Sequence, residues 1–215
     1  GIINDSIVQE AARQEIIRRY FRYTCEYIMG FADKDSVQRI ELLMEEFGLS
    51  PENRKVVEPA RKAAQDAQQK NKNNLSVFCG AAIELSSGKI ITGKNSNLMH
   101  SASSVVLNAI KFLAEIPDKI HLLAPNILES IQNLKKNTLD EKAVNLDLEE
   151  TMIALSISAA ANPAAQVAME KLKELKNCEI HLTHIPTPGD EAGLRRLGLN
   201  ITADPNFSSK NLFVV

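Results

Sequence analysis

The sequence has 215 residues, of which 25 are Lys or Arg and 27 are Asp or Glu, so its formal net charge is −2. This balance excludes the strongly basic surface that binds nucleic acids or anionic membranes, and a 5 % aromatic content without Trp offers no platform for base stacking. The length suits one sizeable core, or a helical segment followed by one α/β domain.

The first part of the chain, residues 1–74, is expected to be a helical lead-in segment. Residues 4–6 read Asn-Asp-Ser, which is typical of a helix start, and apolar residues then recur at three- and four-residue spacing over residues 8–28. Asp33 is expected to cap a second helix, and Gly48 is expected to end it. These patterns predict two amphipathic helices.

A third helix is expected to start at Ser50-Pro51-Glu52. This string supplies a capping hydroxyl, a Pro at the first helical position and an acid near the positive end of the helix. Pro59 is expected to break or kink this helix, because it lacks a backbone donor. The polar stretch Gln68–Asn74 then separates the helical segment from an α/β domain of residues 75–215.

The second part of the chain alternates strand and helix patterns. Apolar residues 77–85, a turn at residues 86–89 and an apolar run at residues 90–92 predict a β-hairpin. Helices between the later strands require crossover connections, so the expected fold class is α/β with a mixed, largely parallel sheet covered by helices. The other strands are expected at residues 120–124, 179–185 and 199–203, and the helices at residues 101–113, 127–136, 147–161, 162–177 and 190–198.

Capping residues mark the starts of four of these helices. Ser101 or Ser103 is expected to cap the first, and Asp147 opens a D-x-x-E variant of the capping box. Asn162 precedes a Pro, and Asp190 is expected to cap the last helix.

The order hairpin, helix, strand, Pro, helix is similar to the opening of the cytidine-deaminase-like fold. That fold needs a His or Cys with a Glu on its first helix and a P-C-x-x-C motif at the start of the second, which together hold zinc and move protons. Here residues 100–104 read HSASS without a Glu. Pro125 matches the Pro of the second motif, but neither of its two cysteine positions is a cysteine. The sequence therefore predicts a deaminase-like topology without zinc ligands, and no metal or other cofactor.

The cysteines and histidines give no sign of a disulfide framework or a metal site. Cys25, Cys79 and Cys178 lie far apart and form no CxxC motif, which predicts reduced thiols in a cytoplasmic protein. His181 and His184 form an H-x-x-H pattern, but residues three apart on a strand face opposite sides. The two histidines are therefore poorly placed to hold one metal ion.

The best candidate for a ligand site is the polar segment of residues 88–104. Two Gly-Lys pairs and a serine-rich helix start offer N–H groups, hydroxyls and positive charge to an anion. The segment is not a Walker A loop, because Asn95 replaces the Ser or Thr that should follow the Lys. Ordinary hairpin turns and a helix cap are the simpler interpretation of the same residues. The candidate ligand-binding residues are Thr92, Lys94, Asn95, Ser103, Ser104, Asn108 and His181.

Six strings occur in the order found in one known family. They are EAARQEIIRRYF (10–21), RIELLMEEFGLSPENR (39–54), GKIITGKNS (88–96), ASSVVLNAIK (102–111), ALSISAAANPAAQVAME (154–170) and RRLGLNIT (195–202). Over nearly its whole length the chain resembles the C-terminal part of uncharacterised protein family 0371, whose members are bacterial. The resemblance implies a preceding α/β half with a Gly-rich, phosphate-loop-like segment. It also implies that family members carry a His at the position of His181.

Together these features predict a non-catalytic accessory or oligomerisation domain of a larger cytoplasmic protein, which binds a phosphorylated or nucleotide-like small molecule. The expected partners are the missing N-terminal half, a small anionic ligand and a second copy of the chain, and neither nucleic acid nor a membrane. The alternative is part of the active site of a metal-independent enzyme, in which Lys94, Ser103, Ser104, Asn108 and His181 converge in one pocket. A third interpretation is a structural module that uses the apolar stripe of residues 8–28 as a partner face.

Overall fold

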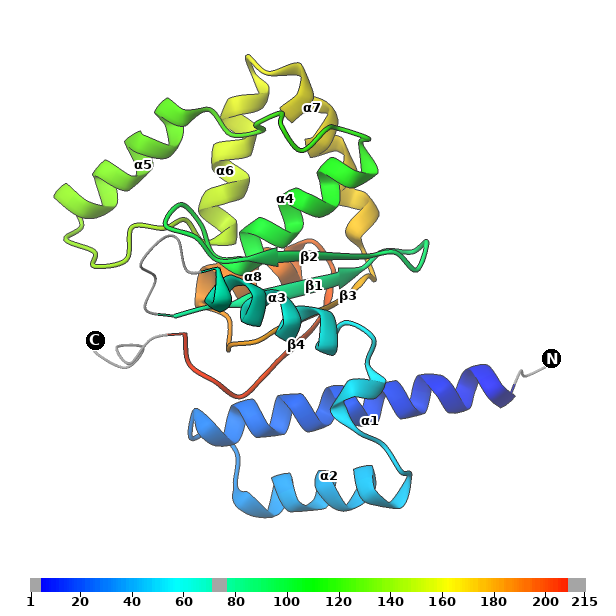
Figure 1. The fold of residues 1–215 in the computed structure, drawn as a ribbon. Helices are drawn as coiled ribbons and strands as arrows, with labels where there is room; N and C mark the ends of the chain where they lie inside the picture. The colour runs from blue at the N-terminus through cyan, green and yellow to red at the C-terminus, as the bar shows by residue number, and fades with distance from the viewer. Residues whose placement is uncertain (1–4, 71–76, 209–215) are drawn as a thin grey trace.

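The computed structural model describes residues 5–70 and 77–208, in which helices surround one small sheet (Figure 1). In these ranges, no helix is both long enough and apolar enough to cross a membrane. Short 3-10 helices lie at Pro51–Asn53 and Lys171–Leu175. The other elements are α1 (Asp5–Ile28), α2 (Lys34–Glu46), α3 (Val57–Gln69), β1 (Gly80–Glu84), β2 (Ile90–Lys94), α4 (Ser101–Leu113), α5 (Pro125–Asn137), α6 (Leu148–Ala159), α7 (Pro163–Glu170), β3 (Glu179–Leu182), α8 (Pro188–Arg196) and β4 (Asn200–Ala203).

The four strands form a mixed sheet in the order β2-β1-β3-β4. The expected α/β class and mixed sheet are confirmed, but only the β3–β4 pairing is parallel, so the sheet is not largely parallel. The helical crossover from β2 to β3 does give these two strands the same direction, as crossover connections require. The hairpin strand β1 then lies between them and runs the opposite way, which makes both of its pairings antiparallel.

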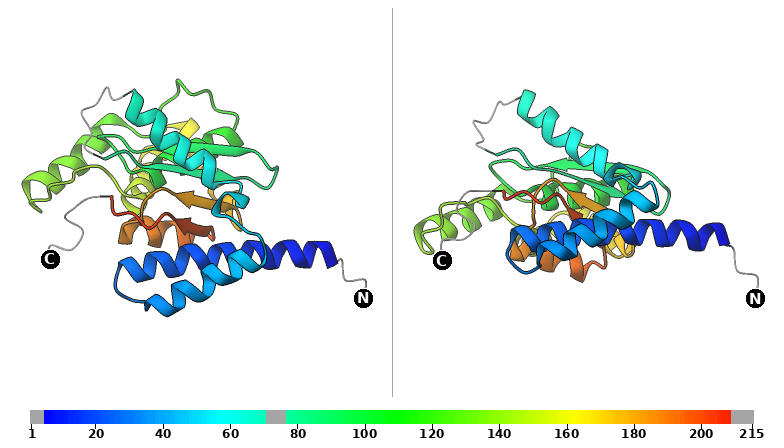
Figure 2. Two further views of the ribbon diagram at one scale, coloured as in Figure 1. Left: turned by 60° about the horizontal axis from the view of Figure 1, so that its bottom comes forward. Right: turned by 90° about the horizontal axis from the view of Figure 1, so that it is seen from below.

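Helices cover both faces of the sheet (Figures 1 and 2). α4 packs on one face, backed by α6, α7 and α8, while α3 and α1 pack on the other. α2 lies on the side of α1 that points away from the sheet (Figure 1). The division into domains of residues 1–74 and 75–215 stays a prediction, and residues 71–76 around the proposed boundary lie outside the described residues.

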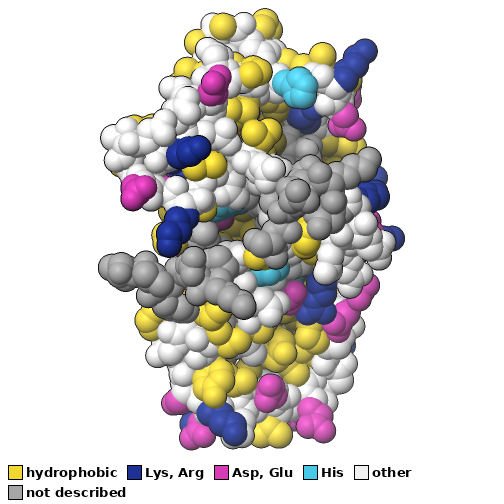
Figure 3. Space-filling model, turned by 60° about the vertical axis from the view of Figure 1, so that its left-hand side comes forward, with side chains coloured by type: hydrophobic (Ala, Val, Ile, Leu, Met, Phe, Trp, Pro, Cys, Tyr) yellow, Lys and Arg dark blue, Asp and Glu magenta, His cyan; other side chains and the backbone are white. Residues whose placement is uncertain are grey.

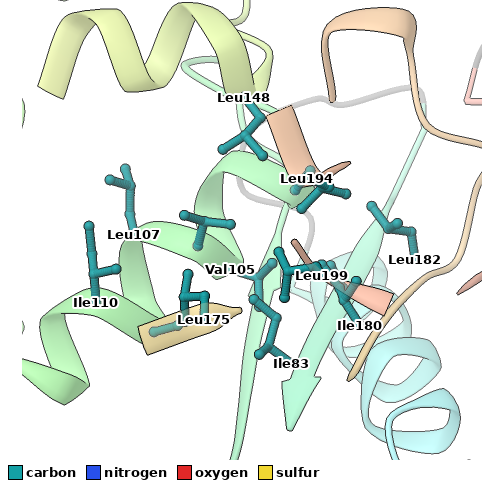
Figure 4. Close-up of a cluster of buried hydrophobic side chains, with 14 of the residues drawn as sticks. Ile83, Val105, Leu107, Ile110, Leu148, Leu175, Ile180, Leu182, Leu194 and Leu199 are labelled. Carbon is teal, nitrogen blue, oxygen red and sulfur yellow. The ribbon is translucent and has the colours of Figure 1, made fainter. Parts of the chain in front are cut away.

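The strand residues alternate between two buried clusters. Ala81 and Ile83 of β1 join the larger cluster on the α4 side, whereas Ala82 packs with α3. Each fully buried aliphatic side chain contributes roughly 1.5–3 kcal/mol, so the larger cluster dominates the stability of the fold. Figure 4 shows its members converging from the sheet and from α4, α6 and α8: Ile83, Val105, Leu107, Ile110, Leu148, Leu175, Ile180, Leu182, Leu194 and Leu199.

Several expected helix ends are confirmed. The carboxylate of Asp33 accepts a hydrogen bond from the first turn of α2, and Gly48 has a φ of +56°, the left-handed conformation that ends the helix. Asp147 forms the expected capping box of α6, and Asn162 caps α7. α1 begins at residue 5 as expected, and residue 4 lies outside the described residues.

The expected start of the third helix is wrong. Ser50-Pro51-Glu52 opens only one turn of 3-10 helix, and α3 begins at Val57. Pro59 consequently lies in the first turn of α3 and does not break it. The backbone N–H groups of a first turn have no partner inside the helix, so the missing donor of Pro59 removes no helical hydrogen bond.

Two further capping assignments are also wrong. His100, rather than Ser101 or Ser103, occupies the cap position of α4. Thr187, rather than Asp190, caps α8, because the Thr187 side chain accepts from the Asp190 backbone N–H. The carboxylate of Asp190 can therefore bond to other partners. His100 lies at the N-terminus of α4.

The strand expected at residues 120–124 does not form. Its backbone bonds to side chains instead of to a neighbouring strand: Asn162 Nδ2 donates to the His121 carbonyl at 2.9 Å, and the Ala124 N–H donates to Ser158 Oγ at 3.0 Å. The two leucines of the segment are buried, so its apolar pattern reflects core packing without strand pairing. Without this strand the order of elements that resembled a deaminase opening is absent, and the deaminase-like topology is not confirmed.

Candidate functional site

A cavity of about 210 Å³ opens beside the start of α4. Residues that lie before β1, around the start of α4, before α6, from β3 to the start of α8, and after β4 form its walls, so distant parts of the chain meet there. Figure 3 turns this side of the molecule forward and shows histidine side chains near the middle of the face. The polar and titratable residues that line the cavity include Cys79, Asn95, His100, Ser101, His184 and Asp190.

His100 and Asp190 form the best-defined pair in this cavity. His100 Nδ1 lies 2.7 Å from Asp190 Oδ2. Asp190 also accepts hydrogen bonds from the Leu148 N–H and from Thr187 Oγ1, both at 2.9 Å. Because a carboxylate only accepts, Nδ1 of His100 carries the proton, and no hydrogen bond from a described residue reaches its Nε2. Nε2 is therefore the atom that the pair offers to a ligand.

Three helix starts hold this pair in place. His100 caps α4, Leu148 is the first residue of α6, and Asp190 lies in the first turn of α8. The N-terminus of a helix carries partial positive charge, which favours a carboxylate at this meeting point. The side chain of Asp190 is only 5 % exposed, so it anchors the imidazole from inside the protein.

The environment of His100 favours its charged form. Burial lowers the pKa of the imidazole, but the hydrogen bond and the charge of Asp190 outweigh burial and raise the pKa above its ordinary value of 6.5. The side chain is still 22 % exposed, so it can meet solvent and ligands. When protonated, His100 brings a partly exposed N–H donor, paired with Asp190, to this wall of the cavity.

The other titratable groups of the cavity are not activated nucleophiles. Burial raises the pKa of the Cys79 thiol to about 12, so it stays protonated at neutral pH. His184 Nδ1 lies 2.9 Å from Thr183 Oγ1, and burial lowers the pKa of His184. The amide of Asn95 is occupied by the backbone of Cys79 and Val77. The cavity therefore offers groups for binding rather than a nucleophile paired with a base.

The residues expected at the Gly-Lys hairpin are divided between the two faces of the sheet. Asn95 lines the cavity, where its amide holds the chain before β1. Gly93 faces α4, since a Cβ placed there would lie 2.3 Å from the Val105 nitrogen. Thr92 and Lys94, on either side of Gly93, therefore face away from α4, and both are exposed.

The residues expected on α4 and β3 do not form one group. Asn108 Nδ2 donates to the Thr92 carbonyl oxygen at 2.9 Å, but Ser103 and His181 lie elsewhere. Ser103 is buried, and its hydroxyl lies 3.4 Å from the Leu146 carbonyl oxygen. Ser104 and Asn108 line a different cavity, of about 190 Å³. His181 pairs with Ala82, whose side chain packs with α3, so His181 faces the side of the sheet opposite α4. The single pocket required by the enzyme interpretation is thus not found.

His181 belongs to a buried polar cluster under α3. Its Nδ1 lies 2.9 Å from Thr202 Oγ1, and its Nε2 lies 3.4 Å from Asp204 Oδ1 without the alignment of a hydrogen bond. Arg61 donates from Nε and Nη2 to the two oxygens of Asp204, at 3.1 and 2.7 Å. The cluster connects α3 to β3 and to the residue after β4, which is a structural role. Among residues 5–70 and 77–208, no group of three or more His, Cys, Asp or Glu side chains is placed to hold a metal ion.

We expect Asp204 to make the protein sensitive to acid. Burial opposes the charged carboxylate, but contacts with His181 and Arg61 outweigh burial and lower the pKa of Asp204 from 3.8 to about 2. The charged form therefore stabilises the fold by about 2 kcal/mol above pH 4, and this contribution is lost as the pH falls towards 2. Urea unfolding of wild type and Asp204→Asn should give free energies that differ most at pH 7 and approach each other below pH 4. A constant difference down to pH 3 would show that Asp204 contributes no such term.

Sequence reasoning missed the central pair of the cavity. It assigned Asp190 to a helix cap and considered His100 only as a failed zinc motif. The signal that was available is Thr187-Pro188, a capping hydroxyl followed by Pro at the first helical position. That start puts Asp190 three positions past the cap, in the first turn of α8, but only the fold brings it to His100, 90 residues away.

Comparison with known proteins assigns the chain to a family. The family model described as domain of unknown function DUF1846, C-terminal, matches residues 52–213. The chain belongs to this DUF1846 family. A second model, domain of unknown function DUF1846, N-terminal, matches residues 1–48. The two DUF1846 models thus meet at the short segment between α2 and α3.

The relatives are longer bacterial proteins. The chain is 50 % identical over 214 residues to a UPF0371 protein of Clostridium botulinum strain Eklund 17B, and 48 % identical over 214 residues to a UPF0371 protein of Clostridium tetani. Each alignment covers 99 % of this chain and 42 % of the relative. The resemblance to family 0371 is confirmed, and the chain spans less than half the length of the relatives that it matches.

Proposed function

We propose that this chain is an accessory part of a larger protein and binds a small anionic molecule in the cavity beside His100. The observation that carries the proposal is the His100–Asp190 pair beside the N-terminus of α4. Asp190 favours the protonated form of the imidazole, and the Nε2 of His100 receives no hydrogen bond from residues 5–70 and 77–208. An anion with oxygen acceptors, such as a phosphoryl or carboxylate group, suits a charged donor at this position. Ser101, which is the first residue of α4 and lines the cavity, adds a hydroxyl.

The size of the cavity narrows the ligand class. Its volume of about 210 Å³ is below the roughly 300–1,000 Å³ of sites that take drug-sized ligands. A phosphoryl or carboxylate group with a few attached atoms is a better match than a whole nucleotide. A phosphorylated ligand therefore agrees better with this cavity than the nucleotide-like ligand that the sequence also suggested.

The protonated Cys79 thiol in the cavity favours binding over catalysis. A nucleophile needs a lowered pKa or a neighbouring base, whereas the Cys79 thiol has its pKa raised to about 12. The DUF1846 description names no reaction, so it adds no support for the enzyme alternative. Cytoplasmic location and self-association stay predictions of the sequence.

Thermal unfolding with sulfate as the probe tests the proposal. Sulfate has the geometry of a phosphate but does not titrate near neutral pH, so changes with pH report on the protein. We expect sulfate to raise the Tm of wild type more than sodium chloride of equal ionic strength, and to do so more strongly at pH 6 than at pH 8. This direction follows because the imidazolium of His100 is lost as the pH rises through its pKa.

Two matched variants sharpen this test. In His100→Asn the amide nitrogen can still donate to Asp190, but Nε2 and the positive charge are removed. His121→Asn changes an exposed histidine that lines a different cavity. We expect the sulfate-specific shift to disappear in His100→Asn and to persist in His121→Asn. An equal shift in all three proteins would refute binding at His100.

A further inference from the structure

The helical hairpin α1–α2 exposes an unusual amount of apolar surface. Phe31 is 79 % exposed, Ile7 65 % and Leu42 64 %, and Val8 and Phe47 are also exposed. We call these five residues the hairpin surface. α2 is held through Met44, which packs with Ile17 and Phe21 of α1, so the opposite side of α2 has no cover among the described residues. Several exposed large apolar side chains on one pair of helices are often part of an interface.

The first two turns of α1 carry an independent sign of a missing partner. Every residue from 5 to 12 is helical and exposed. In Figure 1 this end of α1 extends past the sheet. A helix gains most of its stability from packing, and short stretches of helix are marginal in water. The apolar side chains of Ile7 and Val8 in this stretch are therefore left largely uncovered by residues 5–70 and 77–208.

The comparisons indicate what makes this contact. The N-terminal DUF1846 model ends at residue 48, and the C-terminal model begins at residue 52, so α1 and α2 match the N-terminal unit of the family. The chain covers only 42 % of its relatives, so the longer proteins have room for the rest of that unit. The hairpin thus corresponds to the last part of a unit whose other members precede it in the longer proteins.

We propose that the hairpin surface is the contact between this chain and the preceding N-terminal unit of the longer protein. Ile7 and Val8 extend this contact along the exposed end of α1, and Leu42 and Phe47 extend it over α2. Further along α1, Ile17 and Phe21 pack with Val57 of α3 as well as with Met44 of α2. The hairpin would thereby connect the two units: its buried residues pack on α3, and its exposed apolar residues contact the preceding unit. This inference does not depend on a ligand at His100.

Hydrogen exchange tests this proposal in the longer protein, with the complete N-terminal unit preceding residue 1. We expect amides of residues 5–12 to exchange at least tenfold more slowly there than in the 215-residue chain. Leu42→Asp should lower the Tm of the longer protein but leave that of the 215-residue chain nearly unchanged. Leu134→Asp, at a similarly exposed leucine of α5, should leave the Tm of both proteins nearly unchanged.

Two results would overturn the proposal. Equal exchange of residues 5–12 in the longer protein and in the 215-residue chain would show that the preceding unit does not cover α1. Exchange in the 215-residue chain that slows with rising protein concentration, together with a dimer in sedimentation, would assign the hairpin surface to a second copy.

Discussion

Replacing Gly80 with alanine is expected to destabilise the protein by at least about 3 kcal/mol, because the added methyl group would collide with backbone atoms. A Cβ at Gly80 would lie 2.1 Å from the carbonyl oxygen of Ala60 and 2.7 Å from the nitrogen of Ala64. α3 approaches β1 this closely because both sides carry small residues. Backbone atoms cannot turn aside as a flexible side chain can, so α3 would have to move off the sheet. The midpoint of urea unfolding measures this loss.

Gly30→Ala is the matched control for Gly80→Ala. Gly30 has a φ of +80°, but a Cβ there would meet nothing within 4 Å. Its substitution should cost only the strain of a left-handed residue, about 1–2 kcal/mol. A loss at Gly80 no larger than the loss at Gly30 would contradict the close approach of α3 to β1.

Replacing Arg54 with methionine is expected to cost about 3–5 kcal/mol, because it leaves buried polar groups without a partner. The Arg54 side chain is 2 % exposed. It donates to Thr202 Oγ1 at 2.9 Å, to the carbonyl oxygens of Ile180 and Asn200 at 3.2 and 2.8 Å, and to the carboxylate of Glu179. One guanidinium thus joins the end of the 3-10 helix before α3 to β3 and β4.

Arg18→Met is the control for this prediction. Arg18 also donates to Glu179, at 3.1 Å, but its side chain is 29 % exposed and makes its contacts near solvent. Ion pairs of this kind contribute about 0–1 kcal/mol. Urea unfolding of both variants should therefore separate them by several kilocalories per mole. An Arg54→Met protein no less stable than Arg18→Met would contradict the central role of Arg54.

Local sequence patterns correctly predicted some of the helix ends. The Asp33 cap, the left-handed Gly48 and the Asp147 capping box each depend on neighbours within a few residues, and all are as expected. The strand prediction for residues 120–124 was wrong because strand pairing is not local. Leu122 and Leu123 are buried as in a strand, but no strand among the described residues pairs with the segment, and pairing depends on distant parts of the chain.

The candidate site depends even more on distant residues. His100 and Asp190 are 90 positions apart and meet only because the starts of α4 and α8 converge on α6. The Gly-Lys hairpin appeared suited to an anion because its residues are adjacent in sequence. Alternation along β2 instead turns Thr92 and Lys94 away from α4, and only Asn95 of that hairpin reaches the cavity.

The most direct test of the anion-binding cavity is the pKa of His100, measured by NMR with and without sulfate at constant ionic strength. An anion that prefers the imidazolium must raise the pKa of His100, since binding and protonation are linked. The pKa of His181, buried on the other face of the sheet, should not change. We expect sulfate to raise the pKa of His100 alone. A pKa of His100 that is the same with and without sulfate would contradict the proposed site.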